Sequence, residues 1–225
     1  MKNKIVLFCL IILGLNTSKA HLSIHPQFGV SMNKIKTFNL DILGNNKDEI
    51  QYLLGFQGGV GFDFKVGDVL SIEPILRYNQ KGYTEDLSYD YFGINYSRKS
   101  LLRLHYIELP IMANFNMEME KLNMVFTVGP YLGYCVAARG VRESVDGTVT
   151  ESYDSKNDNN FLNDLVDYSG FNRTDVGLNL GIRAEISNFT VGLSGAMSMN
   201  NVFSHGDANK HLNFQFNAGY KIELD

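Results

Sequence analysis

The sequence has no tryptophan, four prolines and two cysteines among its 225 residues. One cysteine, Cys9, lies close to the N-terminus, so Cys135 has no partner for a disulfide in the rest of the chain. No apolar run is long enough for a transmembrane helix, which takes roughly 20 residues. Helices and closed barrels are the structures that satisfy every backbone polar group in lipid. If this chain crosses a membrane, it must do so as a β-barrel.

The N-terminal segment has the composition of a secretory signal peptide, in which Lys2 and Lys4 precede an apolar run over residues 5–15. We expect cleavage after Ala20, and we interpret residues 21–225 as one domain because no linker or internal repeat divides them. The segment carries three of the 20 basic residues, so 17 remain against 24 acidic ones, a net charge of −7. This acidic balance argues against a nucleic-acid partner.

The last segment, residues 211–225, alternates apolar residues with polar residues or glycine. A period of two predicts a β-strand with one apolar face and one polar face. The segment also resembles the C-terminal signal by which bacterial outer-membrane barrels are recognised for insertion, at Asn217, Gly219, Ile222 and Leu224. The partners implied by that signal are outer-membrane lipid and the barrel-insertion machinery.

Seven further segments have the same alternation. The eight predicted strands cover residues 22–33, 52–66, 69–81, 101–117, 122–139, 171–186, 189–200 and 211–225. The connections after the first, third, fifth and seventh are roughly 18, 19, 31 and 10 residues long, whereas the others have two to four. This asymmetry predicts an all-β fold, an eight-stranded antiparallel up-and-down transmembrane barrel with short periplasmic turns and long outer loops.

Two features of the predicted strands depart from regular pairing. In residues 101–117 the apolar face changes phase between Tyr106 and Ile107, which predicts a β-bulge there. All four prolines fall inside predicted strands, where each removes a ladder hydrogen bond. We therefore expect each proline to lie at a bulge or near a strand end.

The same alternation would also fit a secreted, lipocalin-like barrel that binds a ligand inside an apolar interior. An eight-stranded barrel has an interior only just wide enough for its own side chains or one small ligand. Many of the apolar positions hold Phe, Tyr, Leu or Met, which would overfill such an interior, and glycines lie mainly on the polar face. We therefore favour the membrane barrel, with its polar face inward, and keep the soluble barrel as an alternative.

Acidic and basic side chains of nearly equal number share the predicted lumen, where they can pair across strands. We expect a lumen ion-pair network made of Glu73, Arg77, Arg103, Glu108, Arg139, Arg173, Asp175, Arg183 and Glu185. A small barrel filled in this way is an anchor more readily than a pore. The pattern predicts no catalytic residue, no cofactor and no metal site, so the protein is interpreted as a non-enzymatic anchor for surface loops.

Two predicted outer loops, residues 82–100 and 140–170, combine aromatic and acidic side chains. Loops on a rigid scaffold are where recognition usually resides. Protein partners are therefore expected at these loops, with the candidate contact residues Tyr89, Tyr91, Phe92, Asp154, Asp158 and Phe161. The apolar spacing from Phe161 to Val166 fits a short helical turn or a docking patch. A lipid-modifying enzyme acting through Ser204 and His205 is an alternative of a different class.

Two motifs resemble one known family. Residues 106–110, YIELP, are followed by residues 129–133, GPYLG, and together they resemble the paired signature of the PorT-like outer-membrane β-barrel family common in Bacteroidota. The resemblance implies an eight-stranded barrel in the outer membrane of a Gram-negative cell. Because the family's namesake is tied to a protein secretion and gliding apparatus, a component of a secretion or surface-assembly machine is a further alternative.

Overall fold

The computed structural model describes residues 22–37, 49–91, 94–120, 122–146, 149–155, 160–204 and 209–224. The predicted signal peptide lies outside these residues. The elements are β1 Leu22–Thr37, β2 Glu49–Gln51, β3 Leu53–Lys65, β4 Leu70–Tyr91, β5 Ile94–Glu118, β6 Asn123–Asp146, β7 Val149–Asp154, α2 Phe161–Ser169, β8 Thr174–Ile186, β9 Phe189–Ser198, β10 Asn209–Tyr220 and β11 Ile222–Leu224.

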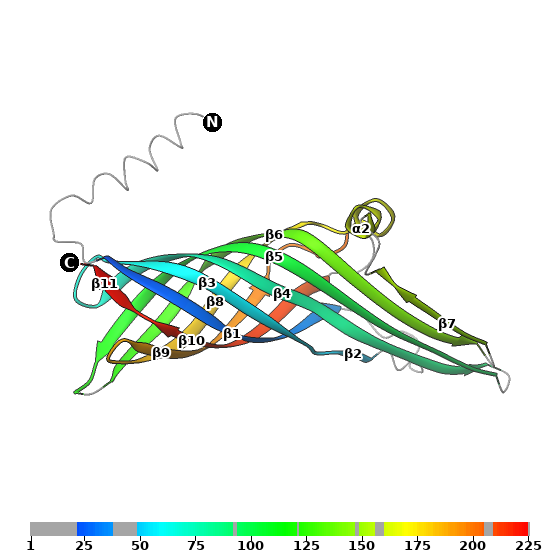
Figure 1. The fold of residues 1–225 in the computed structure, drawn as a ribbon, viewed down its shortest axis with the longest axis horizontal. Coiled ribbons are helices and arrows are strands. Elements are labelled where there is room, and N and C mark those ends of the chain that lie inside the picture. Colours follow the sequence, from blue (N-terminus) through cyan, green and yellow to red (C-terminus); the bar gives the residue numbers. More distant parts are fainter. Residues whose placement is uncertain are drawn as a thin grey trace, which may run out of the picture.

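Eight antiparallel strands close into a ring, in the order β1, β3, β4, β5, β6, β8, β9 and β10, with β10 pairing back to β1 (Figure 1). The short β11 continues the line of β10 after Lys221 and pairs with the first residues of β1. Two accessory strands, β2 and β7, pair with β4 and β6 respectively. The predicted eight-stranded up-and-down barrel is confirmed.

The two ends of the barrel differ. Leu22 and Leu224 are Cα partners, so the first and last described residues lie at one end. The turns from β3 to β4 and from β8 to β9 lie at that end, and the first is closed by a hydrogen bond from the Val66 N–H to the Leu70 carbonyl at 2.9 Å. The accessory strands and α2 lie at the opposite end (Figure 1). In an outer-membrane barrel the short turns are periplasmic, so we refer to these as the inner and outer ends.

The strands present apolar side chains outward and polar side chains inward. Phe28, Leu180 and Leu193 are 69%, 65% and 60% exposed on the outer face, whereas the lumen-facing Glu73, Asn79 and Asn114 are each 0% exposed. This arrangement suits a barrel surrounded by lipid, because a soluble barrel would bury its apolar face. The alternative of a soluble, lipocalin-like barrel is therefore wrong.

The barrel wall continues past its outer end as a sheet. Residues 82–100 were expected to form a loop, but β4 and β5 stay paired from Gly82 and Arg103 to Tyr91 and Ile94. That expectation is wrong because both faces of this hairpin lie beyond the lipid, where alternation no longer separates apolar from polar. We call the continuation the outer sheet: β2, β4 from Gly82, β5 up to Arg103, β6 from Arg139, and β7.

The predicted bulge occurs in the β5–β6 ladder, but its extra residue belongs to β6. His105 pairs with Ala137 and Tyr106 pairs with Cys135, so Val136 is the additional residue. The phase of β5 does not change: Leu102, Leu104 and Tyr106 are buried inside the barrel at 7%, 0% and 0% exposure. Their expected place on the outward apolar face is wrong.

Each proline lies at an interruption of one ladder, without a change of register. For Pro26, the β1 ladder passes from the Ile24–Ile222 pair to the Gln27–Gly219 pair and skips the two positions between them. Equivalent gaps adjoin Pro74 in β3–β4, Pro110 in β4–β5 and Pro130 in β5–β6. The expected bulges or strand ends are wrong here, because the strands keep their register and omit the bonds that a proline cannot donate.

Candidate functional site

The inner half of the lumen holds a connected set of charged side chains that we call the inner network. Lys221 of the β10–β11 junction places its Nζ 2.6 Å from Asp63 Oδ2 of β3 and 3.7 Å from Glu185 Oε1 of β8. Arg183 links Glu185, at 2.9 Å from its Nε, to Glu73 of β4, at 2.9 Å from its Nη1. The network therefore joins strands that are not neighbours in the ring.

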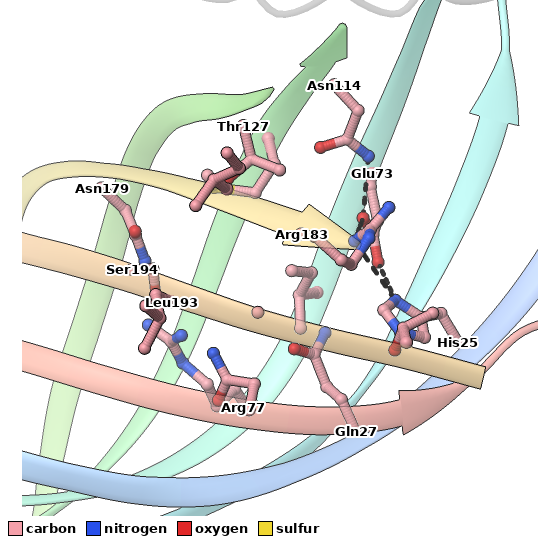
Figure 2. A pocket seen from close by; sticks show the side chains of 16 residues that line it. His25, Gln27, Glu73, Arg77, Asn114, Thr127, Asn179, Arg183, Leu193 and Ser194 are labelled. Carbon is pink, nitrogen blue, oxygen red and sulfur yellow. Dashed lines mark hydrogen bonds and ion pairs between the residues drawn. The ribbon is translucent and has the colours of Figure 1, made fainter. Parts of the chain in front are cut away.

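Glu73 is the acceptor at the centre of the inner network (Figure 2). Its Oε1 lies 2.7 Å from His25 Nδ1, and its Oε2 accepts a hydrogen bond from Asn114 Nδ2 at 2.8 Å as well as the Arg183 contact. His25 Nε2 lies 2.8 Å from the Thr190 hydroxyl. A carboxylate held by three donors from β1, β5 and β8 fixes those strands relative to one another.

Further outward lies a second set, the central network, built on Lys81 of β4. Its Nζ lies 2.6 Å from Glu108 Oε1 of β5 and 2.6 Å from Asp175 Oδ2 of β8. Arg77 donates to Glu108 Oε2 from Nη2 at 2.6 Å and from Nε at 3.0 Å. The Lys81 ammonium also lies 4.6 Å from the centre of the Tyr131 ring, a cation–π distance.

The buried charges nearly balance. Within the described part of the chain, the buried carboxylates are Asp63, Glu73, Glu108, Asp175 and Glu185, and the buried permanent cations are Arg77, Lys81, Arg183 and Lys221. His25 Nδ1 also contacts the Glu73 carboxylate, at 2.7 Å. Pairing of this kind offsets the desolvation free energy of each buried charge, which is roughly several kcal/mol for an isolated ion.

A cavity of about 50 Å³ separates the two networks and is lined by His25, Gln27, Glu73, Arg77, Asn179 and Arg183 among others (Figure 2). Ligand pockets for small molecules span roughly 300–1,000 Å³. Three polar atoms that face this cavity, Gln27 Nε2, Asn179 Oδ1 and Arg183 Nη2, have no hydrogen-bond partner within the described residues. The cavity has the size and polarity of a site for a few water molecules and is too small for an organic substrate.

The outer end of the lumen is closed by an apolar cap, made of Ile35, Leu102, Leu104, Tyr106, Cys135, Phe171 and Val202. Helix α2 packs against this cap through Phe161, Leu162, Leu165 and Val166, which confirms the predicted helical turn. The helix ends at Gly170, whose φ of 63° is left-handed and whose N–H donates to the Val166 carbonyl. Helix α2 lies at the outer end of the barrel, opposite the end where the first and last described residues meet (Figure 1).

Six of the residues expected in the lumen network meet in these two networks: Glu73, Arg77, Glu108, Asp175, Arg183 and Glu185. Three do not, and their expected place in the lumen is wrong. Arg103 and Arg139 are Cα partners on the outward face, because β5 keeps its phase and the bulge at Val136 shifts that of β6. Arg173 precedes β8 and donates to Asn163 Oδ1 of α2 at 2.5 Å.

Lys81 is a central member that the predicted network omits. The sequence did indicate a lumen position for Lys81, because this residue follows Arg77 and Asn79 on the polar face of the predicted strand over residues 69–81. His25 was also omitted, although it occupies a polar-face position of the first strand. Which polar residues meet across the lumen depends on strand tilt and register, which a single sequence does not specify.

The candidate recognition residues have different environments. Tyr89 and Tyr91 belong to the outer part of β4, where their Cα partners are Tyr96 and Ile94. Asp154 ends β7 and forms an ion pair with Arg139 at 2.7 Å, and Phe161 packs on the apolar cap. Phe92, Asp158 and His205 lie outside the described residues.

The residues of the predicted insertion signal lie next to the seam where the chain's two ends meet. Asn217 and Gly219 belong to β10, opposite Gly29 and Gln27 of β1. Ile222 and Leu224 belong to β11 and point outward, at 42% and 41% exposure. Their role in insertion stays a prediction.

Two searches of the described residues gave negative results. No helix in them is both long enough and apolar enough to cross a bilayer. No group of three or more His, Cys, Asp or Glu side chains in these residues could hold a metal ion.

A closed ring of eight strands with an apolar outer surface and a polar, filled interior defines an eight-stranded outer-membrane β-barrel, a protein of the outer membrane of a Gram-negative cell. The family described as outer membrane protein beta-barrel domain matches residues 16–204. The chain belongs to this family.

Solved structures similar to this chain are outer-membrane proteins. The attachment invasion locus protein Ail of Yersinia pestis is 14% identical, with a TM-score of 0.37, and the match covers 91% of this chain and 100% of Ail. OprG of Pseudomonas aeruginosa is 10% identical, with a TM-score of 0.42 and coverage of 93% and 98%. Neisserial surface protein A is 9% identical, with a TM-score of 0.40 and coverage of 89% and 97%. No curated protein sequence matches the chain.

Proposed function

We propose that this protein is a non-enzymatic, non-conducting anchor that holds the outer sheet at the cell surface as a recognition surface. The observation that carries the proposal is the continuity of β4, β5 and β6 from the lipid-facing wall into that sheet. The β4–β5 ladder runs from Leu70 and Phe115 to Tyr91 and Ile94, with its one gap at Pro110. The outer sheet is therefore fixed rigidly to the membrane instead of hanging from flexible loops.

The filled lumen supports the non-conducting part of the proposal. Lys81, Glu108 and Asp175 bridge the barrel from β4 to β8, and the apolar cap closes the lumen above them. An ion that entered would have to displace these pairs, and separating a buried pair costs about 3–5 kcal/mol. Purified protein in planar bilayers should give no ion conductance, and steady conductance would contradict this part.

The chemistry of the outer sheet supports a recognition role. Charges of both signs alternate across its strands, with Arg98 lying 3.3 Å from Glu85 and Lys99 lying 3.7 Å from Asp86 in partly exposed ion pairs. Exposed pairs contribute little to stability, about 0–1 kcal/mol. They can therefore be exchanged for contacts with a polar partner, such as a protein, at small cost.

A shortened hairpin tests the proposal. Tyr83 and Leu102 are Cα partners, so replacing residues 84–101 with Asn-Gly should close β4 and β5 in a two-residue turn. We expect the variant to reach the outer membrane and to keep a heat-modifiable band on gels, but to fail to complement a strain that lacks the protein. Full complementation by the shortened variant would contradict a recognition role for the hairpin.

The narrower resemblance to PorT-like proteins makes a different prediction for the same strains. If the protein belongs to a secretion or surface-assembly machine, the deletion strain should lose exported proteins from its surface and culture medium. Normal export in that strain would remove this candidate and leave recognition by the outer sheet.

A further inference from the structure

Two arginines face each other on the outward surface of the barrel, where β5 and β6 leave the lipid. Arg103 and Arg139 are direct Cα partners, and directly paired residues project from the same face of an antiparallel sheet. Like charges in that position repel each other. The arrangement is therefore unfavourable unless negative charge lies close to both guanidinium groups.

One arginine of this pair has a carboxylate partner. Arg139 donates to Asp154 of β7 from Nε at 3.2 Å and from Nη2 at 2.7 Å, and this hydrogen-bonded carboxylate raises the pKa of Arg139 above its usual value. Arg103 has no ion pair or side-chain hydrogen bond to any of the residues described. One negative charge thus offsets two positive ones, and the pair keeps a net positive charge.

The pair lies at the height of lipid headgroups. On β5 the outward residues Ile107 and Leu109 are exposed apolar side chains, and Arg103 is four positions beyond Ile107. Four residues of strand extend about 13 Å, or about 9 Å along the membrane normal at a tilt of about 45°. Arginine side chains reach back toward an interface, so both guanidinium groups lie within the headgroup layer.

Two further cations face outward at the outer end of the barrel. They are Lys34 of β1, whose Nζ lies 5.4 Å from the centre of the Tyr52 ring, and Lys210 of β10. The outer sheet beyond them carries exposed charges of both signs, with Glu143 and Asp154 as well as Arg142.

We propose that Arg103 and Arg139 together bind a phosphate group of a phosphorylated glycolipid of the outer leaflet. A phosphate between two guanidinium groups accepts charge-assisted hydrogen bonds from both and converts their repulsion into attraction. The acyl chains of the same lipid would run inward along Ile107, Leu109 and Val136, which are exposed on the adjoining outward surface. Free inorganic phosphate could use the arginines but not the apolar surface, so we assign the site to the lipid.

The test titrates the refolded full chain in zwitterionic detergent micelles with bisphosphorylated lipid A and counts bound lipid by native mass spectrometry. We expect Arg103→Gln to weaken binding about ten-fold, the effect of losing a charge-assisted contact of about 1.4 kcal/mol. The matched control is Lys99→Gln, which removes an exposed cation from the same face of β5 four residues further out. This control should bind lipid A like the wild type.

Two further arms separate the sources of phosphate. Dephosphorylated lipid A should bind the wild type no better than it binds Arg103→Gln, and millimolar inorganic phosphate should not displace lipid A. Equal binding of lipid A by the wild type and Arg103→Gln would overturn the proposal. Displacement by inorganic phosphate would also overturn it, because it would show a free-anion site. Because Arg103 is on the outward surface and outside both lumen networks, Arg103→Gln should keep the wild-type heat-modifiable band.

Discussion

Lys81 and Asp175 form an ion pair that crosses the lumen. They lie on β4 and β8, which are separated in the ring by β5 and β6, and the distance from Nζ to Oδ2 is 2.6 Å. A hydrogen-bonded strand pair holds only neighbours together. This contact instead fixes opposite walls of the barrel, and it explains how a narrow lumen can contribute to stability.

We predict that Lys81→Met destabilises the folded barrel by about 3–5 kcal/mol, because it leaves two buried carboxylates without their shared cation. The double variant Lys81→Met with Asp175→Asn should recover part of this loss, since Glu108 keeps Arg77. Urea unfolding followed by the heat-modifiable gel shift measures both. Lys65→Met, at an exposed inner-rim position, is the control and should change little. Equal effects of Lys81→Met and the control would contradict a stabilising role.

The Phe161 ring of helix α2 packs against the barrel at a position, Gly140 of β6, where there is no side chain. A Cβ added at Gly140 of β6 would lie 2.5 Å from Phe161 Cζ, so Gly140→Val should displace the helix from the apolar cap while the barrel stays closed. Limited proteolysis should then cut between β7 and β8 faster than in the wild type. Gly140→Val with Phe161→Ala should restore protection, because the smaller side chain removes the clash. Failure of the second change to restore protection would argue against this contact.

The hairpin of β4 and β5 in the outer sheet begins at Gly82, where the backbone has a conformation that favours glycine. Gly82 has a φ of 143°, and a Cβ there would lie 1.9 Å from the Leu102 carbonyl oxygen. Gly82→Ala should therefore cost about 1–3 kcal/mol of unfolding free energy, seen as a lower urea midpoint. Gly67→Ala, in the turn between β3 and β4, has nothing within 4 Å of the added Cβ and should be close to neutral. A neutral Gly82→Ala would mean that β4 has another conformation here.

The alternation of apolar and polar residues predicted the barrel because its two faces meet media as different as lipid and a polar lumen. The same logic fails where that difference ends. Residues 83–87, Tyr-Thr-Glu-Asp-Leu, continue β4. Because Glu85 interrupts the apolar alternation, the sequence alone could not distinguish this stretch from a loop. The extension of β4 and β5 beyond the lipid could therefore be identified only from the structure.

The misplacement of Arg139 in the lumen network traces to one residue. Val136 adds a position to β6, so Arg139 faces outward although its spacing from Met124 and Phe126 suggested regular alternation. A bulge changes which face every later residue occupies. The apolar phase change predicted in residues 101–117 has a different origin, because Leu102, Leu104 and Tyr106 are buried in the apolar cap while β5 keeps its phase. The sequence did not indicate the extra residue in β6. The resulting outward pair of arginines is the basis of the proposed lipid site.

The predicted insertion signal can be separated from fold stability through a matched pair. Ile222 of β11 and Ile24 of β1 are Cα partners, and Ile24 is not part of the signal. Serine at either position removes similar outward apolar surface. Ile222→Ser and Ile24→Ser should therefore lower the unfolding free energy of the purified barrel, measured in urea, by nearly equal amounts of about 1 kcal/mol. Pulse-chase labelling of cells should distinguish them: Ile222→Ser should slow the appearance of the heat-modifiable form several-fold, whereas Ile24→Ser should follow the wild type. If both variants slow assembly equally, the effect belongs to the β1–β11 seam as a structural contact, and the tail is not read as a signal.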